Sequence, residues 1–103
     1  SVARVVKHIQ TNYGAPLRVA ELAKLAGLSP YQFERRIRAI FQLTPGQFIQ
    51  KVRMENAMRL LRESGAAIAR IALDCGYSDQ SAFTRQFRQT TGMTPSDYRA
   101  TGC

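Results

Sequence analysis

Apolar residues along this chain recur at three- and four-residue spacings, and no segment alternates apolar and polar residues as a strand does. Such spacing places the apolar side chains on one face of an α-helix. We therefore predict an all-α fold of seven helices. The expected ranges are 2–13, 19–26, 30–42, 46–63, 68–75, 79–91 and 95–98.

Capping residues and prolines mark where several of these helices begin. Ser29 is followed three residues later by Gln32, which is the pattern of a capping box. Thr44 and Gln47 repeat that pattern ahead of the longest helix. Ser78 is expected to cap the helix over 79–91, because serine oxygens accept hydrogen bonds from free helix N–H groups.

The chain also contains an internal repeat. Residues 19–23 resemble residues 68–72 at an offset of 49, and from Phe33 onward the offset becomes 50. A single inserted residue between Ser78 and Phe83 explains the change. The pairs at offset 50 are Phe33 and Phe83, Arg35 and Arg85, Arg38 and Arg88, Thr44 and Thr94, Pro45 and Pro95, and Phe48 and Tyr98.

The repeated unit is a short helix, a turn containing glycine, and a longer helix, which is the helix-turn-helix pattern. In that motif the second helix enters the major groove of DNA, so it needs one core face and one outward face. On the core side we expect Phe33, Ile37, Ile40 and Phe41 in the first unit, and Phe83 and Phe87 in the second. The outward stripes are Tyr31, Glu34, Arg35 and Arg38, and then Gln80, Ser81, Thr84, Arg85 and Arg88.

These outward residue types suit contact with DNA. Arginine can pair with guanine, glutamine with adenine, and a carboxylate such as that of Glu34 can accept from the cytosine amino group. Hydroxyl side chains and helix N-termini can hold phosphates. Solvated helix faces would have a similar composition, but the matched positions of Arg35 and Arg85 favour DNA reading.

Charge supports an anionic partner. The 103 residues include 15 basic and 7 acidic side chains, for a net charge of +8. Nucleic acid is the first candidate for that partner. Charge alone also leaves open an anionic membrane surface, and a module that docks acidic proteins or RNA polymerase with little DNA binding.

Several classes of site are not expected. The sequence offers no catalytic triad, paired carboxylates, phosphate-binding glycine loop or metal-ligand spacing, so we predict no enzyme, cofactor or metal. No apolar run is long enough for a membrane span. Cys75 lies in an apolar helical pattern and is interpreted as a core residue, and Cys103 is terminal. Two cysteines suit a reducing cytoplasm.

The helix over 46–63 has an apolar surface too wide for one neighbour. A helix of this length spans roughly 27 Å. Adjacent major-groove segments on one face of DNA lie roughly 34 Å apart. We expect this helix to connect the two units and to place both reading helices in adjacent groove segments. Because it is short for straight DNA, bent DNA or partial engagement of one unit is expected. The apolar positions are Phe48, Val52, Met54, Ala57, Met58, Leu60 and Leu61.

The chain resembles the AraC/XylS family of transcription regulators from Val2 to Arg99. The resemblance rests on Arg53, Ala57, Leu60, Leu61, Ile68, Ala69, Gly76, Tyr77, Ser78, Ser81, Phe83, Arg85, Phe87, Gly92, Thr94, Pro95, Tyr98 and Arg99. It implies two helix-turn-helix subdomains, at 1–44 and 65–103, joined by a connector helix at 45–64. It also implies sequence-specific binding to double-stranded promoter DNA and contact with RNA polymerase.

The same resemblance implies roles for the outward residues. Base contacts would come from Tyr31, Glu34 and Arg35, and from Gln80, Ser81, Thr84 and Arg85. Backbone contacts would come from Ser29, Arg38, Ser78 and Arg88. Most family members also have an N-terminal domain that senses a small-molecule effector or dimerises. This chain lacks that domain, so it is either a part of a longer regulator or one of the short stand-alone members. Because it begins at Ser1, we expect it to be the C-terminal part of a longer regulator.

Overall fold

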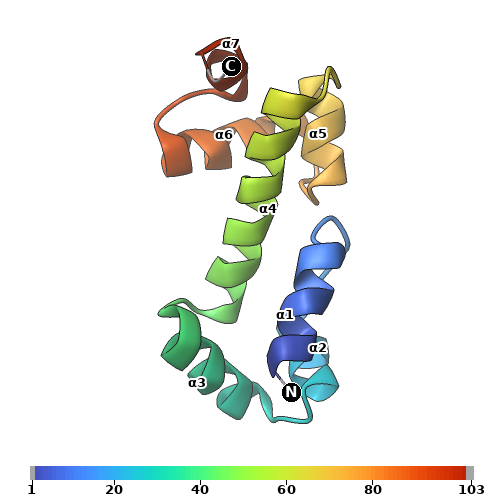
Figure 1. Ribbon diagram of the computed structural model, residues 1–103, viewed down its shortest axis with the longest axis vertical. Coiled ribbons are helices and arrows are strands. Elements are labelled where there is room, and N and C mark those ends of the chain that lie inside the picture. Colours follow the sequence, from blue (N-terminus) through green and yellow to red (C-terminus); the bar gives the residue numbers. More distant parts are fainter. Residues whose placement is uncertain (1, 102–103) are drawn as a thin grey trace. The chain divides into compact units, whose positions relative to one another are not determined.

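The computed structural model describes residues 2–101, and every regular element in that range is an α-helix (Figure 1). The predicted all-α fold of seven helices is confirmed for this range. The helices are α1 (Val2–Thr11), α2 (Val19–Leu25), α3 (Pro30–Phe41), α4 (Pro45–Glu63), α5 (Ile68–Asp74), α6 (Gln80–Thr91) and α7 (Pro95–Thr101).

The helices form two compact units, Ser1–Val52 and Arg53–Cys103, and the boundary between them falls inside α4. In the first unit, α1 and α2 pack against α3. In the second unit, α5 and α7 pack against α6. In each unit the longer helix of the repeat, α3 or α6, is packed against its neighbours on one side, and its other side is exposed.

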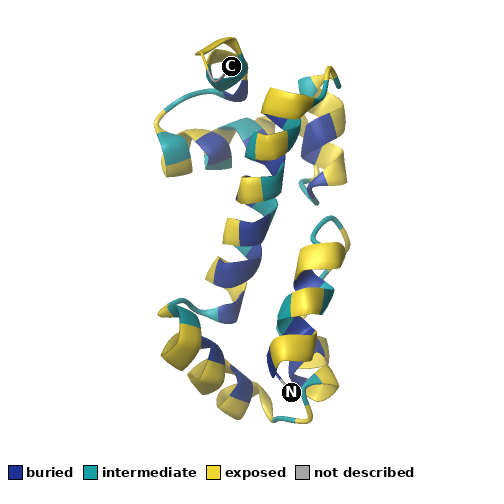
Figure 2. Ribbon diagram, viewed as in Figure 1, coloured by how far each residue is buried: buried dark blue, intermediate teal, exposed yellow. Residues whose placement is uncertain are grey.

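The core of the first unit is an apolar cluster that takes side chains from four helices. Phe33 and Ile37 of α3 have no exposed surface. Burial of a side chain of this size stabilises a fold by about 1.5–3 kcal/mol. Figure 2 shows the consequence for α3, whose buried positions alternate with a broad exposed face. The buried members of the cluster are Val2, Val5, Ile9, Leu22, Ala23, Phe33, Ile37, Phe48, Ile49 and Val52.

Ile40 was expected in this core, and that prediction is wrong because its side chain is 54% exposed. The buried stripe of α3 advances in steps of four residues, from Phe33 to Ile37 to the half-buried Phe41. Each such step moves the stripe about 40° around the helix in one direction. Ile40 lies about 20° from Phe33 in the opposite direction, at the border of the stripe. The Phe41 ring stacks on Phe48 with centroids 4.5 Å apart, and Ile40 is left at the edge.

The core of the second unit contains a row of four aromatic rings. Tyr77 and Phe83 have centroids 5.2 Å apart, Phe83 and Phe87 5.7 Å, and Phe87 and Tyr98 5.6 Å. The Tyr98 hydroxyl accepts a hydrogen bond of 2.6 Å from Arg62 Nη1. Tyr77 and Tyr98 are therefore core anchors, and the row fixes α6 between the preceding turn and α7.

Arg99 supports the end of α4. Its Nε donates to the Leu61 carbonyl oxygen at 3.2 Å, and its Nη2 donates to the Ser64 carbonyl oxygen at 3.3 Å. The last carbonyls of a helix lack partners within the helix and attract positive charge. Arg99 therefore has a structural role in joining α7 to the last turn of α4.

The helix N-termini are capped as predicted at two positions and differently at a third. Ser29 forms a complete capping box with Gln32, and Thr44 and Gln47 exchange the same pair of hydrogen bonds. The predicted cap of the sixth helix, Ser78, is wrong. Asp79 is the N-cap, and its Oδ1 accepts from the Ala82 N–H at 2.8 Å.

The position of the inserted residue explains this correction. The N-cap Ser29 and the N-cap Asp79 are related by the same offset as Phe33 and Phe83, so the insertion lies in the turn before α6 rather than inside the helix. The turn of the second unit is one residue longer, and Ser78 becomes the residue before the cap.

Cys75 is fully buried at the end of α5, as predicted. Burial raises the pKa of its thiol to about 11, and the neighbouring Asp74 carboxylate adds to the increase. A thiol of this kind is neutral and unreactive near neutral pH. Cys103 lies outside the described residues.

Candidate nucleic-acid interface

Phe33 and Ile37 face the core, and the other side of α3 is exposed to solvent. Figure 2 shows this exposed face along the helix. All of the predicted outward residues of this helix are exposed, and the Tyr31 side chain is 71% exposed. The residues on this face are Tyr31, Glu34, Arg35 and Arg38. Their exposure is the geometric condition for contact with a ligand as large as a DNA duplex.

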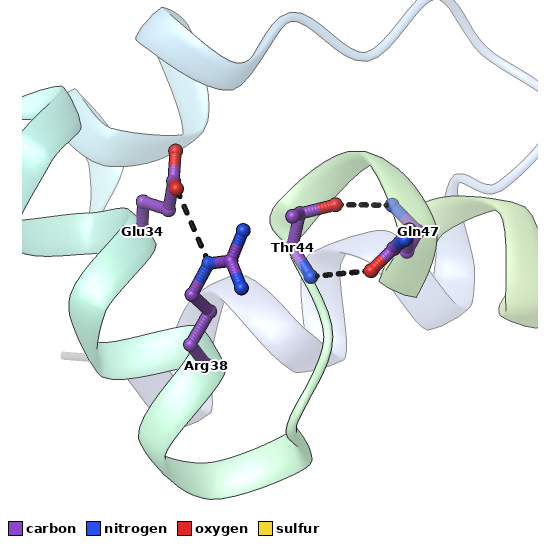
Figure 3. A network of polar contacts seen from close by, with 4 residues as sticks. All are labelled: Glu34, Arg38, Thr44 and Gln47. Carbon is purple, nitrogen blue, oxygen red and sulfur yellow. Dashed lines mark hydrogen bonds and ion pairs between the residues drawn. The ribbon is translucent and has the colours of Figure 1, made fainter.

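Two contacts organise this face. The Arg35 Cζ atom lies 5.7 Å from the centroid of the Tyr31 ring, which is a cation–π distance. Arg38 Nε donates to Glu34 Oε2 at 3.2 Å (Figure 3). Both contacts join residues one helical turn apart, so α3 itself positions these side chains.

The corresponding side of α6 is also open. Gln80, Ser81, Arg85 and Arg88 are exposed, and Thr84 is half-buried. A shallow hollow along the helix is lined by Ser81, Thr84, Arg85, Arg88 and Gln89. Within residues 2–101, neither Arg85 nor Arg88 forms an ion pair or a side-chain hydrogen bond. Both guanidinium groups therefore keep all their donors for a partner.

Sequence reasoning missed two exposed residues beside the predicted ones. Arg36 lines a second hollow, with Arg35 and Ala39, and Gln89 lines the hollow on α6. Gln89 lies four residues after Arg85, so helical spacing was a signal that could have identified it. Arg36 lies about 100° from Arg35 around the helix and falls outside a narrow stripe.

The start of each outward helix adds hydrogen-bond donors. Ser29 is exposed, and its Oγ accepts from the Gln32 N–H at 3.1 Å, which leaves its hydroxyl hydrogen free to donate. Ser78 is exposed one residue before the Asp79 cap. A helix N-terminus with such donors favours phosphate.

Two other kinds of site are absent from the described part of the chain. No helix in residues 2–101 is both long and apolar enough to cross a membrane. In the same range, His, Cys, Asp and Glu side chains form no group suited to a metal ion.

The chain is similar to a known protein family and to known regulatory proteins. A family model described as "Helix-turn-helix domain" matches residues 22–101. The regulatory protein SoxS of Escherichia coli K12 is 35% identical over 95 residues, which cover 92% of this chain and 89% of SoxS. The probable transcriptional regulator LumQ of Photobacterium leiognathi is 32% identical over 92 residues, which cover 89% of this chain but 37% of LumQ.

Solved structures give the same result. The DNA-binding domain of the global transcriptional factor AdpA, solved in complex with a target DNA, superposes with a TM-score of 0.90 at 32% identity. That match covers 95% of this chain and 88% of the AdpA chain. An AraC-type regulator from Chromobacterium violaceum superposes with a TM-score of 0.89 at 28% identity over 95% of this chain and 88% of its own.

The family model covers most of the chain, the two relatives are described as regulators, and one matched structure is described as an AraC-type regulator. The residues on which the resemblance rests lie in the second unit, in its core, in its turns and on the exposed face of α6. The chain therefore belongs to the AraC/XylS family of transcription regulators and comprises the helix-turn-helix DNA-binding domain of that family.

Proposed function

We propose that this chain regulates transcription by binding double-stranded promoter DNA in a sequence-specific manner, with α3 and α6 as its two reading helices. One observation supports this most strongly. In each unit an exposed arginine, Arg35 or Arg85, lies two residues after a fully buried phenylalanine, Phe33 or Phe83. The same inward and outward faces have therefore been kept in both copies of the repeat.

The proposed roles follow the chemistry of the exposed side chains. Bases are read from α3 by Tyr31, Glu34 and Arg35, and from α6 by Gln80, Ser81, Thr84 and Arg85. The DNA backbone is held by Ser29, Arg38, Ser78 and Arg88. Arg36 and Gln89 join these sets as backbone contacts because they border the same hollows.

We further propose that α4 is the connector between subdomains 1–44 and 65–103. A helix of its length spans roughly 28 Å, which suits two adjacent groove segments on DNA bent toward the domain. The activity of the whole regulator is also a proposal. It includes contact with RNA polymerase in the bacterial nucleoid and control by a small-molecule effector through an N-terminal domain.

Substitution of Arg85 tests base reading. The wild-type chain is first used to select a preferred duplex from a random pool, and dissociation constants are then measured on both. Arg85→Ala is expected to weaken binding to the selected duplex by about 1–3 kcal/mol and to the random pool by far less. Arg4→Ala, which removes an exposed arginine from α1, is the matched control for charge.

Equal losses on the selected duplex and the random pool would show that Arg85 contributes charge without reading bases. A wild-type chain that enriches no sequence at all would refute the proposed function itself. In that case, docking of acidic proteins through the basic surface would become the better account of the net charge of +8.

A further inference from the structure

The ion pair between Glu34 and Arg38 lies among the side chains proposed to contact DNA. The two side chains are joined at 3.2 Å and remain about half exposed, at 52% for Glu34 and 57% for Arg38. An exposed pair of this kind adds little to the stability of a fold. Its consequence is instead a change in the charge of the surface that meets DNA.

The geometry of the pair leaves one carboxylate oxygen of Glu34 and the two terminal nitrogens of Arg38 available to a ligand. Only Nε of Arg38 and Oε2 of Glu34 take part in the bond. Figure 3 shows the two terminal nitrogens of the guanidinium directed away from the carboxylate. Within the described residues, Glu34 Oε1 has no hydrogen-bond partner. The pair can therefore accept a hydrogen bond on one side and donate hydrogen bonds on the other.

The second unit provides an internal comparison. Arg88 is the counterpart of Arg38 in the repeat, but the position equivalent to Glu34 is occupied by Thr84, which has no charge. Within residues 2–101, Arg88 forms no ion pair. One arginine on the outward face of α3 is thus neutralised, whereas its counterpart on α6 keeps its full positive charge.

We propose that Glu34 is a specificity-determining residue that restricts α3 to DNA sites offering an amino group in the major groove. This inference rests on the proposed function. On other DNA sequences, the Glu34 carboxylate repels the phosphates and cancels the charge of Arg38. The phosphate backbone of the DNA alone therefore attracts α3 only weakly. Opposite a cytosine, Glu34 Oε1 accepts from the 4-amino group while Arg38 holds a phosphate through its terminal nitrogens.

The test compares Glu34→Gln with the wild-type chain on two probes, a random duplex pool and the duplex that the wild-type chain selects from it. Dissociation constants are measured across a series of salt concentrations. Glu34→Gln is expected to tighten binding to the random pool by about three- to tenfold. The plot of log affinity against log salt should steepen by about 1, because one more cation is free to displace counterions.

The ratio of selected to random affinity is expected to fall about five- to tenfold in Glu34→Gln. A fresh selection with this variant should also lose a cytosine preference at one position. The matched control is Glu63→Gln at the exposed end of α4, which changes the net charge equally. It should leave the ratio of affinities unchanged.

The converse substitution uses the repeat. Thr84→Glu places a carboxylate four residues before Arg88 and copies the arrangement of α3 onto α6. Binding to the random pool should weaken by about three- to tenfold, and the salt dependence should become shallower by about 1. This variant tests the charge effect without altering α3.

Three results would overturn the inference. They are an unchanged random-pool affinity in Glu34→Gln, an unchanged ratio of affinities, or a Glu63→Gln control that behaves like Glu34→Gln. In each case a wild-type chain that still prefers its selected duplex leaves the proposed function standing. A wild-type chain with no preference removes the proposed function and this inference together.

Discussion

Gly76 and Gly27 occupy equivalent turns, and both have positive φ angles, of +93° and +75°. Their surroundings differ. A Cβ atom on Gly76 would lie 3.0 Å from Cζ and Nε of Arg53, whereas a Cβ atom on Gly27 would meet nothing within 4 Å. The turn of the second unit is thus packed against a side chain of α4, and the turn of the first unit is open.

Alanine at these glycines should therefore have unequal effects on stability. Gly27→Ala is expected to lower the free energy of unfolding by about 1–2 kcal/mol, which is the cost of a left-handed backbone for an L-residue. Gly76→Ala should cost more, because Arg53 must also move. Urea unfolding measures both, and in an Arg53→Ala background the two costs should become similar. Equal costs in the wild-type background would contradict the importance of this contact.

Cys75 makes a prediction about pH. Its folded-state pKa is raised from 9.0 to about 11, so the folded chain holds the thiol proton more tightly than the unfolded chain does. The tighter binding of this proton adds to the free energy of unfolding. The added stability is fully present below about pH 9 and is lost as the pH rises toward 11. The loss is on the order of 2 kcal/mol. Between these pH values, the free energy of unfolding should decline more steeply for the wild-type chain than for Cys75→Ala. Parallel declines would refute this contribution of the Cys75 thiol.

At the scale of single elements, the caps of α3 and α6 can be compared directly. Ser29→Ala and Asp79→Ala should each lower the free energy of unfolding by about 1 kcal/mol, because each leaves a helix N–H without its acceptor. Ser78→Ala should change it by far less, because Ser78 precedes the cap. Thermal unfolding of the three variants measures these effects, and a large effect of Ser78→Ala with none of Asp79→Ala would contradict the cap assignment.

The helices themselves follow from short-range patterns that are visible in the sequence. Spacing identified all of them, and the capping box of Ser29 identified the start of α3. The two corrections concern what short-range patterns do not contain. Ile40 fits the helical period but lies past the edge of the packed core. The change of repeat offset shows that one residue is inserted, but it does not place that residue before Asp79.

The candidate site could be predicted as a face and not as a set of contacts. Because buried Phe33 and Phe83 fix the inward sides, the outward residues of both helices followed from spacing. The pairing of Glu34 with Arg38 depends on side-chain rotamers, and so does the approach of Arg35 to Tyr31. The periodicity of a sequence contains no information about rotamers, and the roles of these residues in base reading stay predictions.

At the scale of the whole molecule, the net charge of +8 predicts a strong dependence of DNA affinity on salt. Cations released from the DNA backbone favour binding at low salt. With two to four phosphates neutralised, affinity for random duplex should fall about tenfold to a hundredfold between about 50 and 200 mM salt. Fluorescence anisotropy measures this, and an affinity independent of salt would exclude the backbone contacts proposed for Arg36 and Arg88.

The duplication of the reading unit is the central claim, and parallel in vitro selections with three forms of the chain test it most directly. The wild-type chain should yield two blocks of preferred bases separated by about one helical turn. Arg35→Ala should flatten one block and Arg85→Ala the other. If both substitutions flatten the same block, or if neither alters the selected sequence, the two helices do not act as separate readers of DNA.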